Sequence, residues 1–260
     1  MSQPLAALTI GLPFIELPST DSTNNYARDQ IRAASLPDRQ ELGLHGMAVF
    51  AHQQLAGKGQ RGKSWVAEKD TSIAPSVLIK PASLGIGQQF QLSAAVAIAV
   101  ERFFRKYAGD DTKIKWPNDL YWQDRKAGGI LIENVISGSG TWEWAIAGIG
   151  ININQVHFPA ELPNPVSLKQ ITGKEFDPCQ LARELCVCLD AAYNQLCTEG
   201  FAGIYQEYCT CLYKNGQTVK LKKENRVFEA LVKNVTPEGR LLVQHATEEE
   251  YNFGEIEWVL

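Results

Sequence analysis

Residues 54–65 read Gln54-Leu-Ala-Gly57-Lys-Gly-Gln-Arg-Gly62-Lys63-Ser-Trp65, and residues 57–64 match the phosphate-loop pattern G-x4-G-K-[ST] at every position. Such a loop holds phosphates only when a helix begins at its Lys-Ser pair, because the helix N-terminus then directs its N–H groups at them. The residues that follow, up to an apolar run at 72–80, have no helical periodicity. We therefore predict a glycine-rich basic loop between two strands, and not a nucleoside triphosphatase of the phosphate-loop type.

The sequence on both sides of this loop predicts an α+β fold, because segments with helical spacing alternate with short strand-like runs. Helices are expected from Thr23 into the thirties, over 91–107, from the Asp177-Pro178 start to about Cys197, and over 201–209. Strands are expected at 47–52, 72–80, 112–115, 121–122, 129–134 and 143–149. Three prolines between 155 and 169 predict a loop there.

After about Leu212 the pattern changes to short alternating strands at 217–221, 227–235 and 240–244, separated by turn residues. About 48 residues of this kind predict a small β-barrel that follows the α+β region. We therefore expect two domains, 1–212 and 213–260.

Composition sets limits on the class of protein. The net charge of −4 argues against binding to nucleic-acid phosphates, which depends on clustered Lys and Arg. The first residues lack a basic segment and are interrupted by prolines, and the apolar runs are too short to span a bilayer, so we expect a cytoplasmic protein. The six cysteines have neither zinc-type spacing nor nearby histidines, which predicts reduced, mostly buried thiols.

Five sequence blocks, in this order and spacing, resemble the catalytic domain of biotin protein ligases. The blocks are Asp21-Ser-Thr-Asn24, Gln54-Leu-Ala-Gly57-Lys-Gly-Gln-Arg-Gly-Lys-Ser-Trp65, Lys115-Trp-Pro-Asn-Asp119, Lys126-Ala-Gly-Gly-Ile-Leu-Ile-Glu133 and Gly148-Ile-Gly-Ile-Asn-Ile-Asn154. Gly254-Glu-Ile, near the end of the chain, resembles the family's SH3-like C-terminal domain. The resemblance implies a mixed-sheet catalytic domain followed by an SH3-like β-barrel. Because only twenty residues precede the first block, it implies the monofunctional type without an N-terminal DNA-binding domain.

The resemblance implies that the first, second and fourth blocks bind biotin. Polar side chains suit this role because the ureido group of biotin has donors and an acceptor that need partners when buried. The implied biotin-binding residues are Ser22, Thr23, Asn24, Gln54, Gly57, Lys58, Gly59, Gln60, Trp65, Lys126, Gly128 and Gly129. Helix capping explains Ser22 equally well, and Trp65 also fits a purely structural role.

The resemblance also implies residues for ATP and for catalysis. The implied ATP-binding residues are Lys58, Arg61, Lys63, Lys115, Asn118, Asp119, Asn152 and Asn154, and Asp119 is the implied Mg²⁺ ligand. The implied catalytic residues are Lys126, Lys115 and Lys63, whose charge would stabilise the reacting phosphate. Lys58, Gln60 and Lys63 stand where the family usually has arginine, and lysine lacks the bidentate fork of arginine. A surface lysine and a tight turn are the structural alternatives for Lys126 and for residues 117–119.

The function implied is activation of biotin with Mg-ATP to biotinyl-5′-AMP, followed by transfer to a lysine of a biotin carboxyl carrier protein domain of acetyl-CoA carboxylase or a related carboxylase. No DNA or membrane partner is expected, and a homodimer and a monomer both remain open. The alternatives are a lipoate ligase or lipoyl transferase, a biotin-sensing repressor, and a biotin-binding protein that has lost catalysis. Phe158 is a candidate for stacking on adenine.

Overall fold

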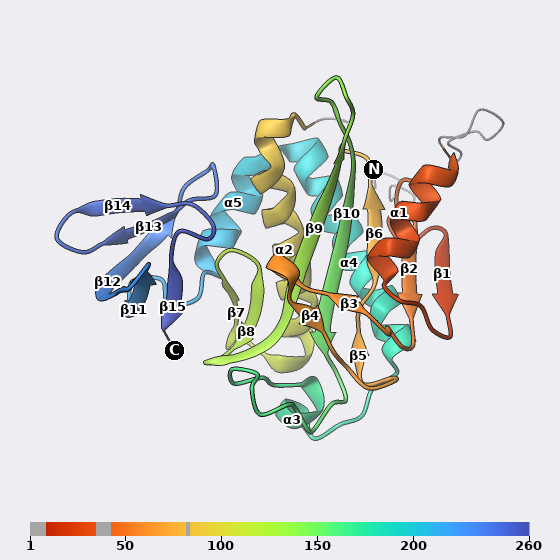
Figure 1. Cartoon of the computed structure of the whole chain (residues 1–260), viewed down its shortest axis with the longest axis horizontal. Helices are drawn as coiled ribbons and strands as arrows, with labels where there is room; N and C mark the ends of the chain where they lie inside the picture. The colour runs from red at the N-terminus through yellow and green to blue at the C-terminus, as the bar shows by residue number, and fades with distance from the viewer. Residues whose placement is uncertain (1–8, 35–42, 82–83, 260) are drawn as a thin grey trace, which may run out of the picture.

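The computed structural model describes residues 9–34, 43–81 and 84–259 (Figure 1). Within these ranges the strands form a mixed eight-stranded sheet, a five-stranded antiparallel sheet and a two-stranded hairpin. The large sheet has the order β1-β2-β6-β10-β9-β8-β7, and β5 pairs with the end of β10. Its strands are β1 (Phe14–Leu17), β2 (Ala48–Ala51), β5 (Ser72–Ile73), β6 (Ser76–Ile79), β7 (Thr112–Lys115), β8 (Asp119–Trp122), β9 (Arg125–Ile136) and β10 (Trp142–Asn152).

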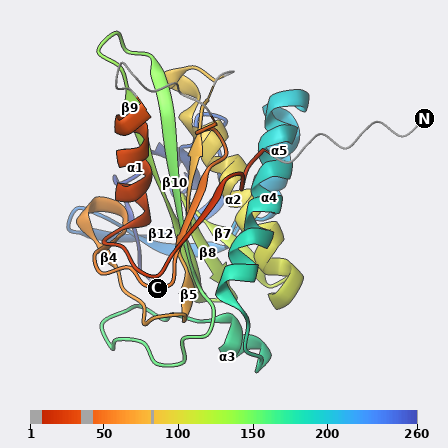
Figure 2. The same ribbon diagram turned by 90° about the vertical axis from the view of Figure 1, so that its right-hand side faces the viewer.

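The two faces of the large sheet are covered by different helices, because side chains alternate between the faces along each strand. Val49, Leu78 and Ile146 point to one face and pack with Ala27 and Ile31 of α1 (Thr23–Ala34). Their sequence neighbours point to the other face, toward α2 (Gln89–Ala108) and α4 (Pro178–Glu199). Figure 2 shows α1 on one side of the strands and α4 on the other. The side that carries α1 is called the α1 face below.

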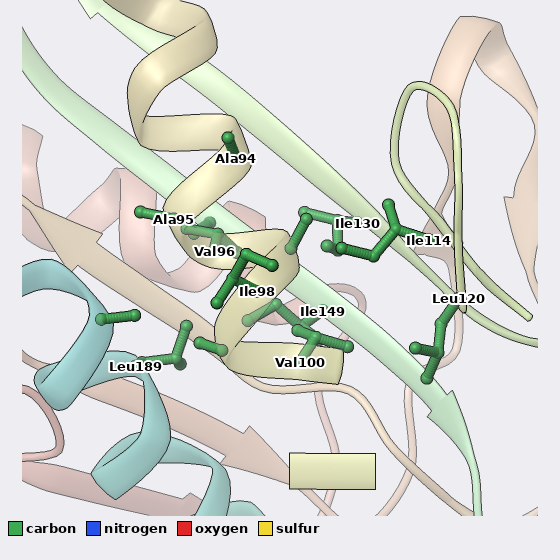
Figure 3. Packing of buried hydrophobic residues seen from close by; sticks show 14 of the residues in the cluster. Ala94, Ala95, Val96, Ile98, Val100, Ile114, Leu120, Ile130, Ile149 and Leu189 are labelled. Carbon is green, nitrogen blue, oxygen red and sulfur yellow. The ribbon is translucent and has the colours of Figure 1, made fainter. Parts of the chain in front are cut away.

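The apolar core lies between the large sheet and α2. In Figure 3, Ile98 and Val100 of α2 pack against Ile130 of β9 and Ile149 of β10. Each of these aliphatic side chains is at most 5% exposed, and burial of one such side chain contributes about 1.5–3 kcal/mol to stability. The α1 face has a smaller apolar cluster, which leaves room on that face for polar groups.

The α+β class and the long helices predicted from the sequence are confirmed. Helix α4 begins where the Asp177-Pro178 pair predicts, and a carboxylate oxygen of Asp177 accepts hydrogen bonds from the N–H groups of Cys179 (2.8 Å) and Gln180 (3.1 Å). Helix α5 (Phe201–Thr210) follows after Gly200. The described residues contain no helix that is both long and apolar enough to cross a membrane.

Several local predictions need correction. The apolar run 72–80 is two strands, because the chain leaves the strand conformation at Ala74 and Pro75, and proline has no N–H for a sheet ladder. The segment predicted as loop up to Lys169 ends in helix α3 (Leu168–Thr172), which Ser167 caps by accepting a hydrogen bond from the Gln170 N–H. The six cysteines, all in the described ranges, form no disulfide, but only Cys186, Cys188 and Cys211 are buried.

The C-terminal sheet lies beside β7 and β8 (Figure 1). Its strands are β11 (Thr218–Lys223), β12 (Arg226–Val235), β13 (Leu241–Gln244), β14 (Glu248–Tyr251) and β15 (Glu257–Val259). The indole N–H of Trp116, in the loop after β7, donates to the carbonyl oxygen of Gly239 on this sheet at 2.9 Å. The sequence did not predict β1, β14 or β15, nor the short strands at 57–58 and 64–65, and the domain limits 1–212 and 213–260 remain a prediction.

Candidate functional site

A strip of glycines on the α1 face forms the centre of the candidate site. Paired residues of neighbouring antiparallel strands point to the same face, and Gly150 of β10 pairs with Gly129 of β9, which pairs with Asp119 of β8. Gly148 lies two residues before Gly150 and therefore on the same face, opposite Ser76 of β6. Polar groups lie at both ends of the strip, and the glycines themselves contribute no side chains to its middle.

A neutral polar cluster lies at the end of the strip that carries the α1 N-terminus. Ser22 and Thr23 are buried there. The Thr23 N–H donates to Oε1 of Gln54 at 2.8 Å, so Gln54 satisfies one of the free N–H groups at the start of the helix. The Thr23 hydroxyl donates to the Ala74 carbonyl oxygen at 2.9 Å and lies 2.8 Å from the Ser76 hydroxyl. This cluster brings the first two sequence blocks together.

Asn24 is held by the protein itself. Its Nδ2 donates to Glu133 at 2.7 Å, its Oδ1 accepts from Ser76 at 2.5 Å, and Glu133 also pairs with Arg28 at 2.8 Å. A Cβ on Gly148 would collide with the Asn24 amide. These contacts support a positioning role for Asn24. The sequence analysis did not identify Ser76, Arg28 or Glu133 as site residues. The position of Glu133 within the otherwise apolar run of β9 could have indicated it.

A cationic cluster lies at the other end of the strip. Lys115 is 8% exposed, donates to the Tyr121 hydroxyl at 3.1 Å, and lies 5.5 Å from the ring centroid of Trp258 on β15. Burial lowers the pKa of Lys115 to about 8, assisted by nearby Lys126 and Lys63 and opposed by Asp119. Neighbouring cations and the burial of Lys115 make this end of the strip suitable for an anion.

Lys126 and Asp119 form an ion pair of 2.6 Å in the same cluster. Both side chains border the space above Gly129. A Cβ on Gly129 would lie 3.2 Å from Asp119 Oδ1 and 3.6 Å from Lys126 Nζ. Asn118 donates its amide N–H to the Ile130 carbonyl oxygen. The third and fourth sequence blocks therefore meet at one place, as their predicted shared role requires.

The glycine-rich loop forms a hairpin over the strip. Strands β3 (Gly57–Lys58) and β4 (Ser64–Trp65) pair, and Lys63-Ser64 leads into β4 instead of a helix, which agrees with the rejection of a phosphate loop. The indole ring of Trp65 lies on Gly150. Gln60 donates to the Ile130 carbonyl oxygen at 3.3 Å, and Lys58 donates to Asn25 of α1 at 2.5 Å. The hairpin thus contacts both α1 and β9.

Other predicted residues have mainly structural contacts. The Gly59 N–H donates to the Lys63 carbonyl oxygen at 2.7 Å and closes the hairpin turn. Gly128 lies against the backbone of Gly150. Asn152 is buried at the end of β10 and donates to the Val166 carbonyl oxygen at 3.1 Å.

Asn154 and Arg61 both contact other parts of the protein, and their roles in ATP binding remain predictions. Asn154 donates to the Phe176 carbonyl oxygen at 2.8 Å and accepts from the Phe176 N–H at 3.1 Å, which gives no support to a role in ATP binding. Arg61 lies on the C-terminal sheet, with its guanidinium 4.7 Å from the ring centroid of Phe253.

A magnesium ion fits this site only together with phosphates. The described residues contain no group of three or more His, Cys, Asp or Glu side chains suited to a metal. One carboxylate, Asp119, is present beside Lys126. Mg²⁺ is often held by one or two carboxylates plus the phosphates of the substrate, so Asp119 is adequate for an ion that arrives with ATP.

Comparison with known families agrees with this geometry. Residues 16–152 match the biotin/lipoate A/B protein ligase family, and residues 215–258 match the biotin protein ligase C-terminal domain. The chain therefore belongs to the biotin/lipoate A/B protein ligase family. The first match contains all five sequence blocks up to Asn152, and the second covers the small sheet, so the family resemblance and the SH3-like assignment are confirmed.

Curated relatives carry ligase names. The chain is 30% identical over 237 residues to the biotin–[acetyl-CoA-carboxylase] ligase of Paracoccus denitrificans, which covers 88% of this chain and 92% of that protein. It is 30% identical over 202 residues to the bifunctional ligase/repressor BirA of Bacillus spizizenii. The latter match covers 76% of this chain but only 62% of the length of BirA.

Solved structures agree on the fold. The biotin protein ligase from Aquifex aeolicus in complex with biotin and ATP superposes with a TM-score of 0.75 at 24% identity, over 94% of this chain and 97% of that one. The biotin protein ligase of Leishmania major in complex with biotinyl-5-AMP gives a TM-score of 0.63 at 23% identity. These likenesses establish the arrangement of the large and small sheets.

Proposed function

We propose that this chain is a biotin protein ligase, which activates biotin with ATP and transfers it to a lysine of a carrier domain. The observation that carries the proposal is the strip on the α1 face. It has neutral hydrogen-bonding groups at one end, cations at the other, and a hairpin of glycines and lysines above it. A neutral bicyclic urea suits the first end, and a carboxylate next to a triphosphate suits the second.

In the first half-reaction, the biotin carboxylate attacks the α-phosphate of ATP and releases pyrophosphate, giving biotinyl-5′-AMP. The carboxylate is already a competent nucleophile, so the protein contributes positioning and charge. Thr23 and Gln54 would hold the ring system, and Ser22 and Trp65 would line it. Lys126 would leave Asp119 for the α-phosphate, where it stabilises the charge that develops in the transition state.

Lys115, Lys63 and Asn118 would complete the phosphate site, with Lys58 and Asn152 as further ATP contacts. Mg²⁺ bound with ATP would be held by Asp119 and would neutralise the phosphate charge. Lysines at positions 58 and 63 supply charge without bidentate geometry. Most of the discrimination for the triphosphate would therefore fall on the buried Lys115 and the partly exposed Lys126.

In the second half-reaction, the amine of a carrier lysine attacks the acyl carbon of the mixed anhydride. An amide bond forms, the acyl–phosphate bond breaks, and AMP leaves. No nucleophile from the enzyme is required. The hairpin at residues 57–65 would keep water from the anhydride until the carrier arrives.

The proposed partner is a biotin carboxyl carrier protein domain of acetyl-CoA carboxylase or a related carboxylase, with the cytoplasm as the place of action. The name of the Paracoccus denitrificans relative and the C-terminal domain match support this choice. The proposal includes no DNA or membrane partner, and it makes no commitment to a homodimer.

Pyrophosphate release from Mg-ATP, with biotin and lipoate tested side by side, is the deciding experiment. Release that depends on biotin, followed by mass gain of a carrier domain, is the expected result. Release with lipoate alone would keep the adenylation mechanism but overturn the substrate. Biotin binding without release would favour a sensor or a protein without catalysis.

A further inference from the structure

The tip of the glycine-rich hairpin is attached to the C-terminal sheet. Arg61, at the tip, has a φ of 54°, a conformation that is uncommon for a residue with a side chain. Its guanidinium stacks on Phe253, which lies in the turn at residues 252–255 between β14 and β15. This turn is called the C-terminal turn below. The contact joins two segments that are almost 200 positions apart in the sequence.

The C-terminal turn is shaped to receive this side chain. Gly254 has a φ of 91°, and a Cβ on it would collide with the guanidinium of Arg61. On its other side, Phe253 packs edge-on against Trp116, with ring centroids 6.3 Å apart. Trp116 in turn donates to Gly239 of the same small sheet at 2.9 Å. The turn therefore has a firm attachment to the large sheet and an open place for Arg61.

The hairpin is held from the opposite side by the large sheet. Gln60, the neighbour of Arg61, donates to the Ile130 carbonyl oxygen on β9 at 3.3 Å. The turn between Gln60 and Lys63 closes with a backbone hydrogen bond of 3.1 Å. Consecutive residues of the tip thus contact two different sheets, which fixes the direction of the tip relative to the glycine strip.

We propose that Arg61 is a positioning residue and that the C-terminal turn, through Arg61, holds the hairpin over the glycine strip before ligands bind. The proposal replaces the ATP contact expected for Arg61, and it rests on the proposed function for its catalytic consequences. It also gives the small domain a task, which is to keep the cover of the site in the binding-competent position.

The expected effect follows from the strength of such contacts. An exposed cation–π pair changes an equilibrium about two- to five-fold. Because the apparent affinity of a ligand scales with the competent fraction of the protein, loss of the pair should raise KM for biotin and for ATP about two- to five-fold. The same loss should leave kcat within about two-fold, because the contact is equally present in the ground state and the transition state.

The test compares F253L, F253Y and R61A with a matched control, F228L. Phe228 is on β12 of the same small sheet and packs against His245 and Tyr251, away from the hairpin. Hydrogen exchange of residues 57–63 is measured without ligands, and KM and kcat are measured by pyrophosphate release. F253L and R61A should exchange faster and show the rise in KM, F253Y should behave as the wild type, and F228L should change neither property of the hairpin.

Other outcomes separate this proposal from the proposed function. Unchanged exchange in F253L and R61A overturns the positioning role. A fall in kcat of about a hundred-fold in R61A alone, with F253L unaffected, makes Arg61 a phosphate contact and also overturns it. Faster exchange in both variants, with no pyrophosphate release from any variant or the wild type, supports the attachment and refutes the ligase. The double variant R61A/F253L should show the same exchange rates and KM values as R61A, because both substitutions remove the same contact.

Discussion

The indole ring of Trp65 lies on Gly150, so that a Cβ added to Gly150 would be 2.8 Å from three atoms of the ring. Through this contact the β3–β4 hairpin packs against β10. Gly150→Ala should displace the ring and lower the affinity for biotin on the order of ten-fold, as overpacking in a close contact commonly costs about 1–3 kcal/mol. Isothermal titration with biotin checks this. Gly138→Ala is the control, because nothing lies within 4 Å of its Cβ position. Equal affinities in the two variants would contradict the seating of the hairpin.

Lys126→Ala should slow adenylate formation by about two or more powers of ten, as loss of one preorganised contact to the transition state commonly does. Pre-steady-state pyrophosphate release measures the step directly. Lys233→Ala is a matched control, because Lys233 also faces a carboxylate, Glu248 at 3.9 Å, but on the small sheet. A rate for Lys126→Ala equal to that of the control, in a folded protein, would remove Lys126 from the chemistry.

The buried lysine of the site predicts a pH dependence of ATP binding. Because burial lowers the pKa of Lys115 to about 8, its charge is present below pH 8 and is lost as the pH rises through that value. ATP affinity should fall above pH 8, and Lys115→Arg, which keeps its charge, should flatten the profile. Titrations from pH 6.5 to 9.5 test this. A wild-type profile without a decline in this range would mean that the charge of Lys115 does not hold ATP.

The same lowered pKa affects stability with the opposite trend. Between about pH 8 and the ordinary lysine value of 10.5, the unfolded chain binds more protons at residue 115 than the folded chain does. The free energy of unfolding contributed by Lys115 should therefore rise with pH across this window. Thermal unfolding of wild type and Lys115→Met, without ligands, should converge as the pH rises. Parallel curves would contradict the assignment.

Glu101 in α2 is a buried carboxyl group outside the site. Its side-chain oxygens are buried, and Oε1 lies 3.7 Å from Arg105. Burial raises the pKa of Glu101 above the ordinary value of 4.5. The buried carboxylate therefore lowers the free energy of unfolding as the pH rises from 4.5 through the pKa of the folded state. Below pH 4.5 the carboxyl group is protonated in both states and has no such effect. Glu101→Gln should raise the free energy of unfolding at pH 7 and have little effect near pH 4. Chemical denaturation at both pH values measures this, with Glu143→Gln at an exposed position of β10 as the control. An equal gain in the free energy of unfolding at pH 7 and pH 4 would contradict the prediction.

The sequence allowed the family, the two sheets and the grouping of five blocks to be predicted, because these depend on local patterns. The glycine-rich loop, the Asp177 cap and the Lys115 and Lys126 segments all carry their signals in neighbouring residues. Strands β14 and β15 carry weak signals, since Glu248 to Glu250 are charged and the β15 strand has three residues. The break between β5 and β6 could not be predicted, because the run 72–80 is apolar throughout most of its length.

The roles of single polar residues were harder to predict, because they depend on partners far away in the sequence. The amide of Asn24 forms hydrogen bonds with Glu133 and Ser76, which lie 109 and 52 positions away. The guanidinium of Arg61 lies over the ring of Phe253, which comes 192 positions later in the sequence. Long-range pairs of this kind leave no mark in the spacing of one sequence.

The glycine strip limits how this protein can change. Gly129, Gly148 and Gly150 already have the smallest residue, so any substitution at these three positions makes the floor of the site higher and never lower. Substitutions at these glycines can therefore only narrow the range of substrates that the site accepts. Acceptance of a bulkier substrate requires changes in the hairpin or in α1. Routes to broader specificity begin at the movable cover, and routes to narrower specificity begin at the sheet.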